Sequence, residues 1–455
     1  MDFKKAIDAS MEALIQDIAE SCRINSVEGE AKPGMPFGEG VAAALDLMLK
    51  KGEEMGFTSK NYDGYVGEID FGDGEEIVGV LGHVDVVPAG DGWETDPWGG
   101  VITEDKIIGR GTLDDKGPLL TCMHAMKILK DLNVPLKRKI RVILGTNEET
   151  DWGCMNYYMN VVKPELPTIA FSPDSNFPLT YAEKGLLQFN LTHAISEDIQ
   201  IEGGSAMNSV PSFAKIALDA KHAEAVKAAV EASEAGVYEV AEEEGKVILS
   251  AKGVIAHAAR LQDGKNAIHR LMALLAKLEL EGDLKAIVDF YAEVFGMSLH
   301  GENMGVFCED DDCGPITLNV SKVYVEDGKF VIGCDTRIPV AFTIESVEEK
   351  VAARVAEFGY EYKRLSTERP LYVPKDSELV TTLMAAYSKV TGDYESQPRS
   401  SGGATYSRAI NNCVAFGCLL PNQVDTMHQA NECLEFENLK IWLGIMVEAL
   451  YQLAK

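Results

Sequence analysis

The sequence is poor in basic residues and contains no long apolar run. Lysine and arginine number 42 against 72 aspartate and glutamate residues, which gives a net charge of −30. Binding to nucleic acid needs clustered lysine and arginine, so this balance argues against nucleic acid and against anionic membranes as partners. No apolar stretch approaches the roughly 20 residues of a membrane span, and the first residues carry no signal-peptide core. We therefore expect a cytoplasmic protein.

The sequence also lacks a cysteine framework. The nine cysteines are an odd number and are scattered along the chain. Cys308 and Cys313 come closest to a pair, but no second pair accompanies them, which argues against a zinc knuckle. We interpret the cysteines as reduced thiols that pack as small apolar side chains. Internal repeats, low-complexity tracts and long linkers are absent as well, and a chain of this length is expected to form two domains.

The first part of the chain contains an alternation of helical and strand patterns. The patterns predict helices near 4–21, 39–55, 117–131 and 152–162, and strands near 64–70, 76–82, 139–146 and 168–172. Such alternation is typical of a mixed, mostly parallel sheet that helices cover, an α/β fold. The active sites of these sheets lie outside the carboxyl ends of the strands.

After residue 182 the pattern changes to strands with polar faces mixed with helices. It predicts strands at 186–192, 245–252, 316–322 and 329–336, and helices at 215–235, 264–281, 283–295 and 343–358. From 365 onward, helices at 376–391 and 435–453 flank a strand at 413–418, as if the first domain resumed. We therefore expect an α+β domain, residues 183–364, inserted into a domain formed by 1–182 and 365–455.

Side chains of the metal-binding type follow three of the predicted strands. Residues two apart on a strand point to the same face, so His83 and Asp85 should face the same way. A carboxylate behind a histidine fixes its tautomer and raises its basicity, as it does in metal sites. Glu148 and Glu149 follow a second strand and Asp174 a third. These side chains are expected to meet at one edge of the sheet.

Two later stretches extend this set. Asp114 and Asp115 lie in Gly-Arg-Gly-Thr-Leu-Asp-Asp-Lys-Gly, and His428 lies in Asp-Thr-Met-His-Gln. Two histidines and several carboxylates suit zinc or a neighbouring divalent metal. Two ions about 3.5–4 Å apart could share one carboxylate and hold a water between them. Taken singly, an acidic pair is usually a turn or a solvated face and a lone histidine is usually structural; their joint occurrence at strand ends favours a site.

The long motifs GRGTLDDKGP, FSPDSNFP and DTMHQANE resemble those of the dinuclear-metal amidohydrolases. This family includes aminoacylase, carnosinase, the glutamate carboxypeptidases and succinyl-diaminopimelate desuccinylase, and the resemblance is strongest with its PepV-type dipeptidases. The resemblance covers nearly the whole chain. It implies that 1–182 and 365–455 form a catalytic domain and that 183–364 form an enlarged lid, which would cover the site within one chain, so we expect a monomer.

Carried over motif by motif, the resemblance implies two bound divalent ions, zinc first, with manganese and cobalt as alternatives. The implied metal ligands are His83, Asp114, Glu149, Asp174 and His428. Asp114 would bridge the ions, with a cis peptide bond to Asp115, and Asp85 would orient His83. Glu148 would be the general base. One departure is Asn147, which precedes the two glutamates where the family usually has aspartate.

The resemblance also assigns residues of the lid. His257 matches a histidine that donates to the oxyanion, and Asn208 matches an asparagine that holds the reacting end of the substrate. Arg337 matches an arginine whose fork suits a C-terminal carboxylate. Gly402 and Gly403 match a turn whose backbone donors could reach the same carboxylate.

The resemblance favours hydrolysis of dipeptides with a free amino terminus, in which Glu148 takes a proton from a metal-bridging water. One alternative is a deacylase of N-acyl or N-succinyl amino acids, and another is a binding protein without catalysis. A dipeptidase needs a carboxylate partner for the substrate amine, and Asp115 is a candidate. His269 is expected on a helix surface, outside the site.

Overall fold

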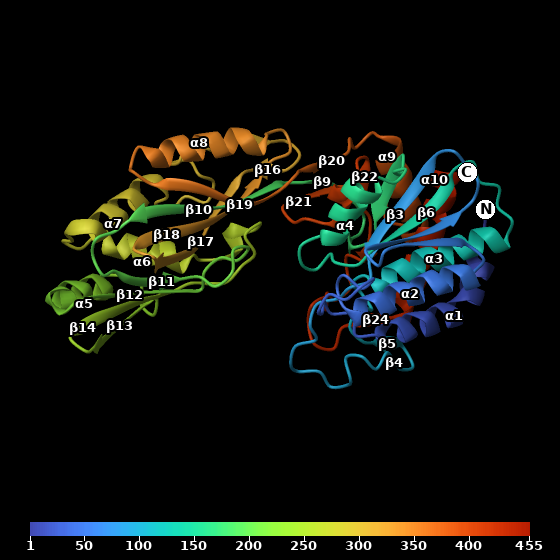
Figure 1. Ribbon diagram of the computed structural model, residues 1–455, viewed down its shortest axis with the longest axis horizontal. Coiled ribbons are helices and arrows are strands. Elements are labelled where there is room, and N and C mark those ends of the chain that lie inside the picture. The colour runs from blue at the N-terminus through green and yellow to red at the C-terminus, as the bar shows by residue number, and fades with distance from the viewer. The chain divides into compact units, whose positions relative to one another are not determined.

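The computed structural model describes residues 1–455, and its contacts divide the chain into two compact units (Figure 1). The first unit contains Met1–Tyr181, Tyr372–Arg399 and Thr405–Lys455, and the second contains Ala182–Leu371 and Ser400–Ala404. None of the helices has the length and apolar character that a membrane span requires.

The first unit combines six helices with one large sheet and two small ones. The helices are α1 (Lys4–Cys22), α2 (Glu39–Glu54), α3 (Lys116–Asp131), α4 (Gly153–Tyr157), α9 (Glu378–Thr391) and α10 (Phe436–Ala454), with the short π-helix η1 (Tyr158–Val162) and the short 3₁₀-helix η4 (Tyr406–Ala409). The large sheet contains β1 (Thr58–Tyr62), β2 (Val66–Phe71), β3 (Ile77–His83), β6 (Lys139–Gly145), β7 (Ile169–Ser172), β9 (Thr180–Glu183), β20 (Leu371–Tyr372), β21 (Arg399–Ser401) and β22 (Cys413–Ala415). The small sheets contain β4 (Val101–Ile102), β5 (Lys106–Ile108) and β24 (Cys433–Glu435), and β8 (Ser175–Asn176) with β23 (Cys418–Leu419).

The centre of the large sheet is parallel, in the order β6-β3-β7-β22. Every residue of β3 and β7 is buried, which explains why their sequences are nearly continuous apolar runs. The register places His83 beside Gly145, and Ala415 beside Ser172, so the four strands end at one edge. Antiparallel pairing of β2 with β6 and of β1 with β2 makes the sheet mixed, as expected.

Helices cover both faces of this sheet. α2, α3 and α10 pack against strands on one side, with α1 beside α3. On the other side, Leu81, Ile143 and Ala170 pack with buried residues of α4, η1 and η4. The fold class predicted for this part of the chain is thus confirmed.

The second unit is an antiparallel sheet packed on helices. Its strands are β10 (Gly185–Ala194), β11 (Gln200–Gly203), β12 (Phe213–Asp219), β13 (Tyr238–Glu243), β14 (Lys246–Lys252), β17 (Thr317–Glu326), β18 (Lys329–Ile338) and β19 (Glu361–Glu368), in the order β13-β14-β12-β11-β17-β18-β10-β19. A small hairpin pairs β15 (Glu309–Asp310) with β16 (Gly314–Pro315). The helices are α5 (Ala223–Glu231), α6 (Ala267–Leu275), α7 (Gly282–Val294) and α8 (Ile344–Ala356), with η2 (Ala220–His222) and η3 (Leu261–Asp263). This is the predicted α+β architecture.

One predicted element of the second unit is wrong. Residues 215–235 were expected to form a helix, but β12 occupies the first part of this range and only α5 is helical. Along β12 the side chains of Ala214, Ile216 and Leu218 are buried while Lys215 is exposed. This period of two is the strand pattern, and the alanine and lysine content of the stretch concealed it.

Candidate functional site

The parallel strands of the first unit bring the predicted ligands together. His83 is the last residue of β3, and Asp174 follows β7 closely. Donor atoms of His83, Glu148 and Asp174 all lie within 4.8 Å of one another, as do those of His83, Asp114 and Glu149. The edge at which these strands end therefore carries a compact cluster of histidine and carboxylate groups.

Asp114 lies between the two histidines of the cluster. Its Oδ1 is 2.9 Å from His83 Nε2, and its Oδ2 is 2.8 Å from His428 Nε2. The peptide bond from Asp114 to Asp115 is cis, as the family resemblance implies. One carboxylate thus faces both histidines, which is the arrangement that a bridging ligand requires.

The other ring nitrogen of His83 faces Asp85. Nδ1 lies 3.0 Å from the backbone oxygen of Asp85 and 3.5 Å from its Oδ1. Because both oxygens are acceptors, Nδ1 carries a hydrogen and Nε2 is directed at Asp114. Asp85 Oδ2 also accepts the backbone N–H of Glu149 at 3.1 Å, so this carboxylate connects the ends of β3 and β6.

The cluster concentrates negative charge in a buried space. Burial raises the pKa of Asp174 to about 7, and the charge of Asp114 adds to this effect. Burial raises the pKa of Glu148 well above its usual range, and the nearby Asp174 and Glu149 act in the same direction. The contact with Asp114 and the nearby carboxylate of Glu149 raise the pKa of His428 to about 10. The cluster therefore favours bound positive charge, whether protons or cations.

The donor set fits divalent metal ions. Glu149 Oε1 is buried and accepts no hydrogen bond, although it lies 3.3 Å from His428 Nε2. Imidazole and carboxylate are the ligands that zinc and neighbouring divalent metals take in proteins. A cation would compensate the crowded carboxylates and occupy the free lone pairs of this oxygen.

In the second unit, Asn208 and His257 lie on two paired segments. Asn208 O accepts the N–H of Ala258 at 2.9 Å, and Ser209 forms an antiparallel bridge with His257. The N–H of Ala259 donates to His257 Nδ1 at 3.1 Å, so Nε2 carries the ring hydrogen. Partial burial and the charge of Arg337 lower the pKa of His257. A neutral ring with an Nε2–H donor is therefore available at an exposed position.

Arg337 is held in the same unit by two partners. Its Nε and Nη2 donate to the two carboxylate oxygens of Asp335 at 2.7 and 3.1 Å, and its Nη1 donates to Gly402 O at 3.0 Å. These contacts use three of the five guanidinium N–H groups and leave two for a ligand. A Cβ on Gly402 would lie 2.7 Å from Ala259 Cβ, so the glycine permits a close approach. Gly403, by contrast, already donates its N–H to Ser401 Oγ at 2.9 Å.

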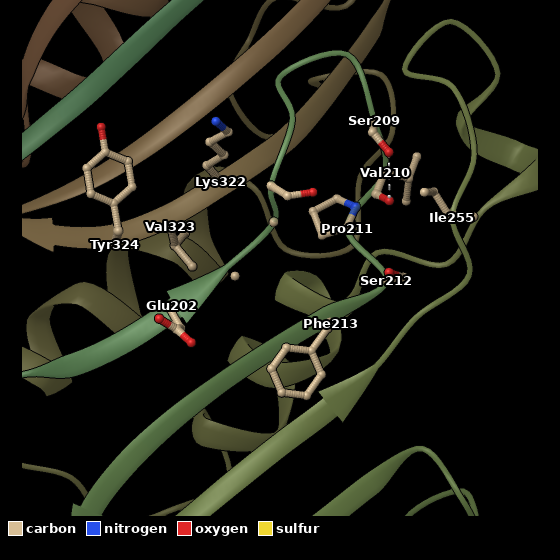
Figure 2. A pocket seen from close by; sticks show the side chains of 13 residues that line it. Glu202, Ser209, Val210, Pro211, Ser212, Phe213, Ile255, Lys322, Val323 and Tyr324 are labelled. Atoms are coloured by element: carbon tan, nitrogen blue, oxygen red, sulfur yellow. Dashed lines mark hydrogen bonds between the residues drawn. The ribbon is translucent and has the colours of Figure 1, made fainter. Parts of the chain in front are cut away.

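A separate pocket of about 550 Å³ is lined in part by Ser209, the residue that bridges to His257 (Figure 2). Ser209 and Ile255 border it, and Lys322, Glu202 and Phe213 line its walls. None of the predicted site residues lines this pocket. It therefore contributes nothing to the assignment of the site.

One expectation from the sequence is wrong, and one candidate loses support. Asp115 has no exposed surface, and its Oδ2 accepts the backbone N–H of His83 at 3.1 Å, which argues against contact with a substrate amine. His269 is not on a helix surface: it is 2% exposed, and its Nδ1 lies 2.9 Å from Tyr291 OH. A helix face that packs inward can carry a histidine when the ring has hydrogen-bond partners.

Sequence reasoning also missed Asp335. The signal was present, because Asp335 and Arg337 are two apart on a strand and must share a face. Asp335 is completely buried, which a lone aspartate in an apolar strand does not reveal without its partner.

The fold and the cluster together define an α/β protein with a metal-type site where parallel strands end. A model of the peptidase family M20/M25/M40 matches residues 79–452. The chain belongs to this peptidase family and is an enzyme of that class.

Relatives of known sequence match the chain from end to end. The Bacillus subtilis protein named "Putative dipeptidase YtjP" is 36% identical, over 100% of both chains. A Staphylococcus aureus protein named "Putative dipeptidase SAR1836" is 34% identical over 99% of both.

Two solved structures share the fold at low sequence identity. Human carnosine dipeptidase 1 is 15% identical, with a TM-score of 0.58 over 98% of this chain and 97% of that one. Aminoacylhistidine dipeptidase from Vibrio alginolyticus also has 15% identity and a TM-score of 0.58, over 97% of both chains. At this identity the likeness supports the fold alone.

Proposed function

We propose that the protein is a metal-dependent dipeptidase that hydrolyses dipeptides with a free amino terminus. The observation that carries the proposal is the cluster around Asp114, in which one carboxylate faces two histidines at the ends of parallel strands. Full-length relatives named as dipeptidases support the substrate class. The first unit would be the catalytic domain and the second the lid.

His83, Asp174 and Asp114 would hold one divalent ion, and Asp114, Glu149 and His428 a second. When bound, the ions would lower the pKa of a water and polarise the scissile carbonyl. Glu148 would take a proton from the attacking water and return it to the leaving amine. Its buried position beside the ligands, which raises its pKa, suits a group that must hold that proton.

His257 would donate its Nε2–H to the developing oxyanion, and the hydrogen bond from Ala259 already selects the required tautomer. Arg337 would bind the C-terminal carboxylate of the dipeptide with its two remaining donors. Asn208, which is exposed beside His257, would hold the reacting end.

Further parts of the proposal concern the metal, the assembly and the compartment. We propose zinc as the favoured ion, with manganese and cobalt as alternatives, since ligand type does not separate them. We also propose that the enzyme acts as a cytoplasmic monomer, which sedimentation equilibrium of the purified chain would check.

The alternative reaction is the removal of an N-acyl or N-succinyl group. It stays open because the buried Asp115 leaves the substrate amine without an assigned carboxylate partner. The test compares free dipeptides with their N-acetyl and N-succinyl counterparts, on metal-stripped protein refilled with zinc or manganese. We expect metal-dependent cleavage of the free dipeptides alone. Cleavage of only the acylated compounds would make the protein a deacylase, and no cleavage of either would contradict both.

A further inference from the structure

A buried ion pair adjoins the metal-type cluster and has no place in the chemistry described above. Arg110 Nη1 lies 2.5 Å from Glu432 Oε2, and the two side chains are 1% and 0% exposed. Arg110 belongs to the stretch that leads to Asp114, and Glu432 belongs to the stretch that follows His428. The pair therefore connects two ligand-bearing segments that are distant in sequence.

Glu432 accepts hydrogen bonds from the backbone immediately before Asp114. Its Oε1 accepts the N–H of Gly111 at 3.1 Å and of Leu113 at 2.8 Å. Its backbone oxygen accepts the N–H of Gly109 at 2.9 Å. Through these contacts one residue fixes the course of the chain up to the carboxylate that faces both histidines.

Arg110 extends the connection to a third segment. Its Nη2 donates to the backbone oxygens of Pro88 and Ala89, each at 3.3 Å. Both residues belong to the loop that follows Asp85. The ion pair thus joins the loops that carry Asp85, Asp114 and His428.

We propose that Glu432, supported by Arg110, is a positioning residue that sets the separation of Asp114 and His428 for the second metal ion. The inference rests on the proposed function, because it assumes that these two side chains share an ion. Metal–ligand bonds of about 2.0–2.2 Å tolerate only small displacements of their donors. Residues behind the ligands typically account for 10–100-fold in metal affinity.

Glu432→Gln tests the proposal with little change in volume. Both carboxylate oxygens of Glu432 face hydrogen-bond donors, and an amide can offer only one acceptor. The amide NH₂ of the glutamine must therefore face either the guanidinium of Arg110 or the backbone N–H groups before Asp114. Two donors repel each other, so the loop before Asp114 has to move. We expect the second ion to bind roughly 10–100-fold more weakly, with a smaller change for the first ion.

The matched control is Asp70→Asn. Asp70 forms a bidentate ion pair with Arg141, at 2.7 Å for both contacts, where β2 pairs with the beginning of β6 and away from the cluster. This variant also replaces a paired carboxylate by an amide. A general effect of losing an ion pair in the first unit should therefore appear in it too, although less strongly, because Asp70 is 20% exposed and Glu432 is not exposed.

The measurement is a titration of metal-stripped protein with Co²⁺. Calorimetry and the visible absorption of the bound ion are its two readouts. Weakened second-step binding and an altered spectrum in Glu432→Gln, with both unchanged in Asp70→Asn, would support the positioning role. Unchanged binding in Glu432→Gln, or an equal loss in both variants, would overturn it. A wild-type chain that takes up no pair of ions would contradict the proposed function itself.

Arg110→Lys gives a second route if Glu432→Gln fails to fold, since breaking a buried pair can be strongly destabilising. Lysine keeps the charge opposite Glu432 but loses the contacts with Pro88 and Ala89. We expect the same weakening of the second ion in a folded protein. Binding as tight as in the wild type would overturn the proposal.

Discussion

At the scale of single residues, Glu148 offers the most direct test of the chemistry. Glu148→Gln keeps the size of the side chain but cannot accept a proton. We expect kcat to fall by about 10²–10⁴-fold, the usual contribution of a general acid–base group, while the bound metal, measured by elemental analysis, stays the same. Glu104→Gln, on an exposed residue, is the control. Near-normal turnover in the Glu148 variant would remove this residue from the role of base.

Asp335 makes the role of Arg337 testable without removing the arginine. Asp335→Asn loses one acceptor of the bidentate contact, so the guanidinium is held less firmly. We expect KM to rise about tenfold for dipeptides with a free C-terminal carboxylate, the equivalent of roughly 1.4 kcal/mol.

Dipeptide amides provide the control for this variant, because they have no carboxylate for Arg337 to bind. KM for the amides should not change. An equal rise in KM for acids and amides would indicate a general disturbance of the second unit rather than a loss of carboxylate recognition.

The contacts that could be predicted from the sequence are short in sequence separation, and those that were missed join distant positions. His83 with Asp85 is a local pattern two residues apart, which the sequence shows directly, although β3 ends at His83. The pair of Arg110 and Glu432 joins positions 322 residues apart, so its burial follows only from the tertiary fold. A single sequence shows two charged residues in two motifs and gives no sign that they touch.

At the scale of elements, strands were predicted best where they are buried on both faces. β3, β6 and β7 were recognised from their apolar runs, at nearly the observed bounds. β1 and β19 were missed because most of their residues are exposed or half-buried and their sequences carry no apolar signal. Edge strands obtain their stability from one neighbour and from tertiary context, which local propensity does not report.

The contact between α6 and α7 predicts a dependence on pH. Burial lowers the pKa of His269 to about 4 from an ordinary value of 6.5. Between these values the unfolded chain binds a proton that the folded chain does not, so stability falls as the pH falls. Lowering the pH from 7.5 to 5 should therefore reduce the stability of the packed α6 and α7 by about 2 kcal/mol, because buried His269 stays neutral in the folded chain.

Hydrogen exchange of α6 peptides, corrected for intrinsic rates, measures this effect. His269→Gln cannot titrate and should show a smaller loss of protection over the same pH range. His222→Gln, at a half-buried position of the same unit, should behave as the wild type. Identical pH dependence in His269→Gln and the wild type would show that His269 does not control it.

At the scale of the whole molecule, proteins with few identical residues share this fold. Human carnosine dipeptidase 1 shares the fold over almost the full chain at 15% identity. The positions that must be kept for such a fold are those of burial and strand order rather than particular side chains. This is why alternation of helices and strands was sufficient to predict the architecture, whereas the roles of individual residues needed the motifs.

Metal removal should act on one unit and leave the other unchanged. Every proposed metal ligand lies in the first unit, and an ion that binds only the folded state stabilises it by about 2.7 kcal/mol at a hundredfold excess over Kd. All four tryptophans also lie in the first unit, so tryptophan fluorescence reports its unfolding. We expect chelation to lower the fluorescence-detected Tm by several degrees.

The exchange protection of α6 and α7, in the second unit, should stay unchanged at temperatures below either transition. Equal loss of protection in both units would mean that they unfold as one cooperative body, and an unchanged Tm would mean that the cluster binds no ion.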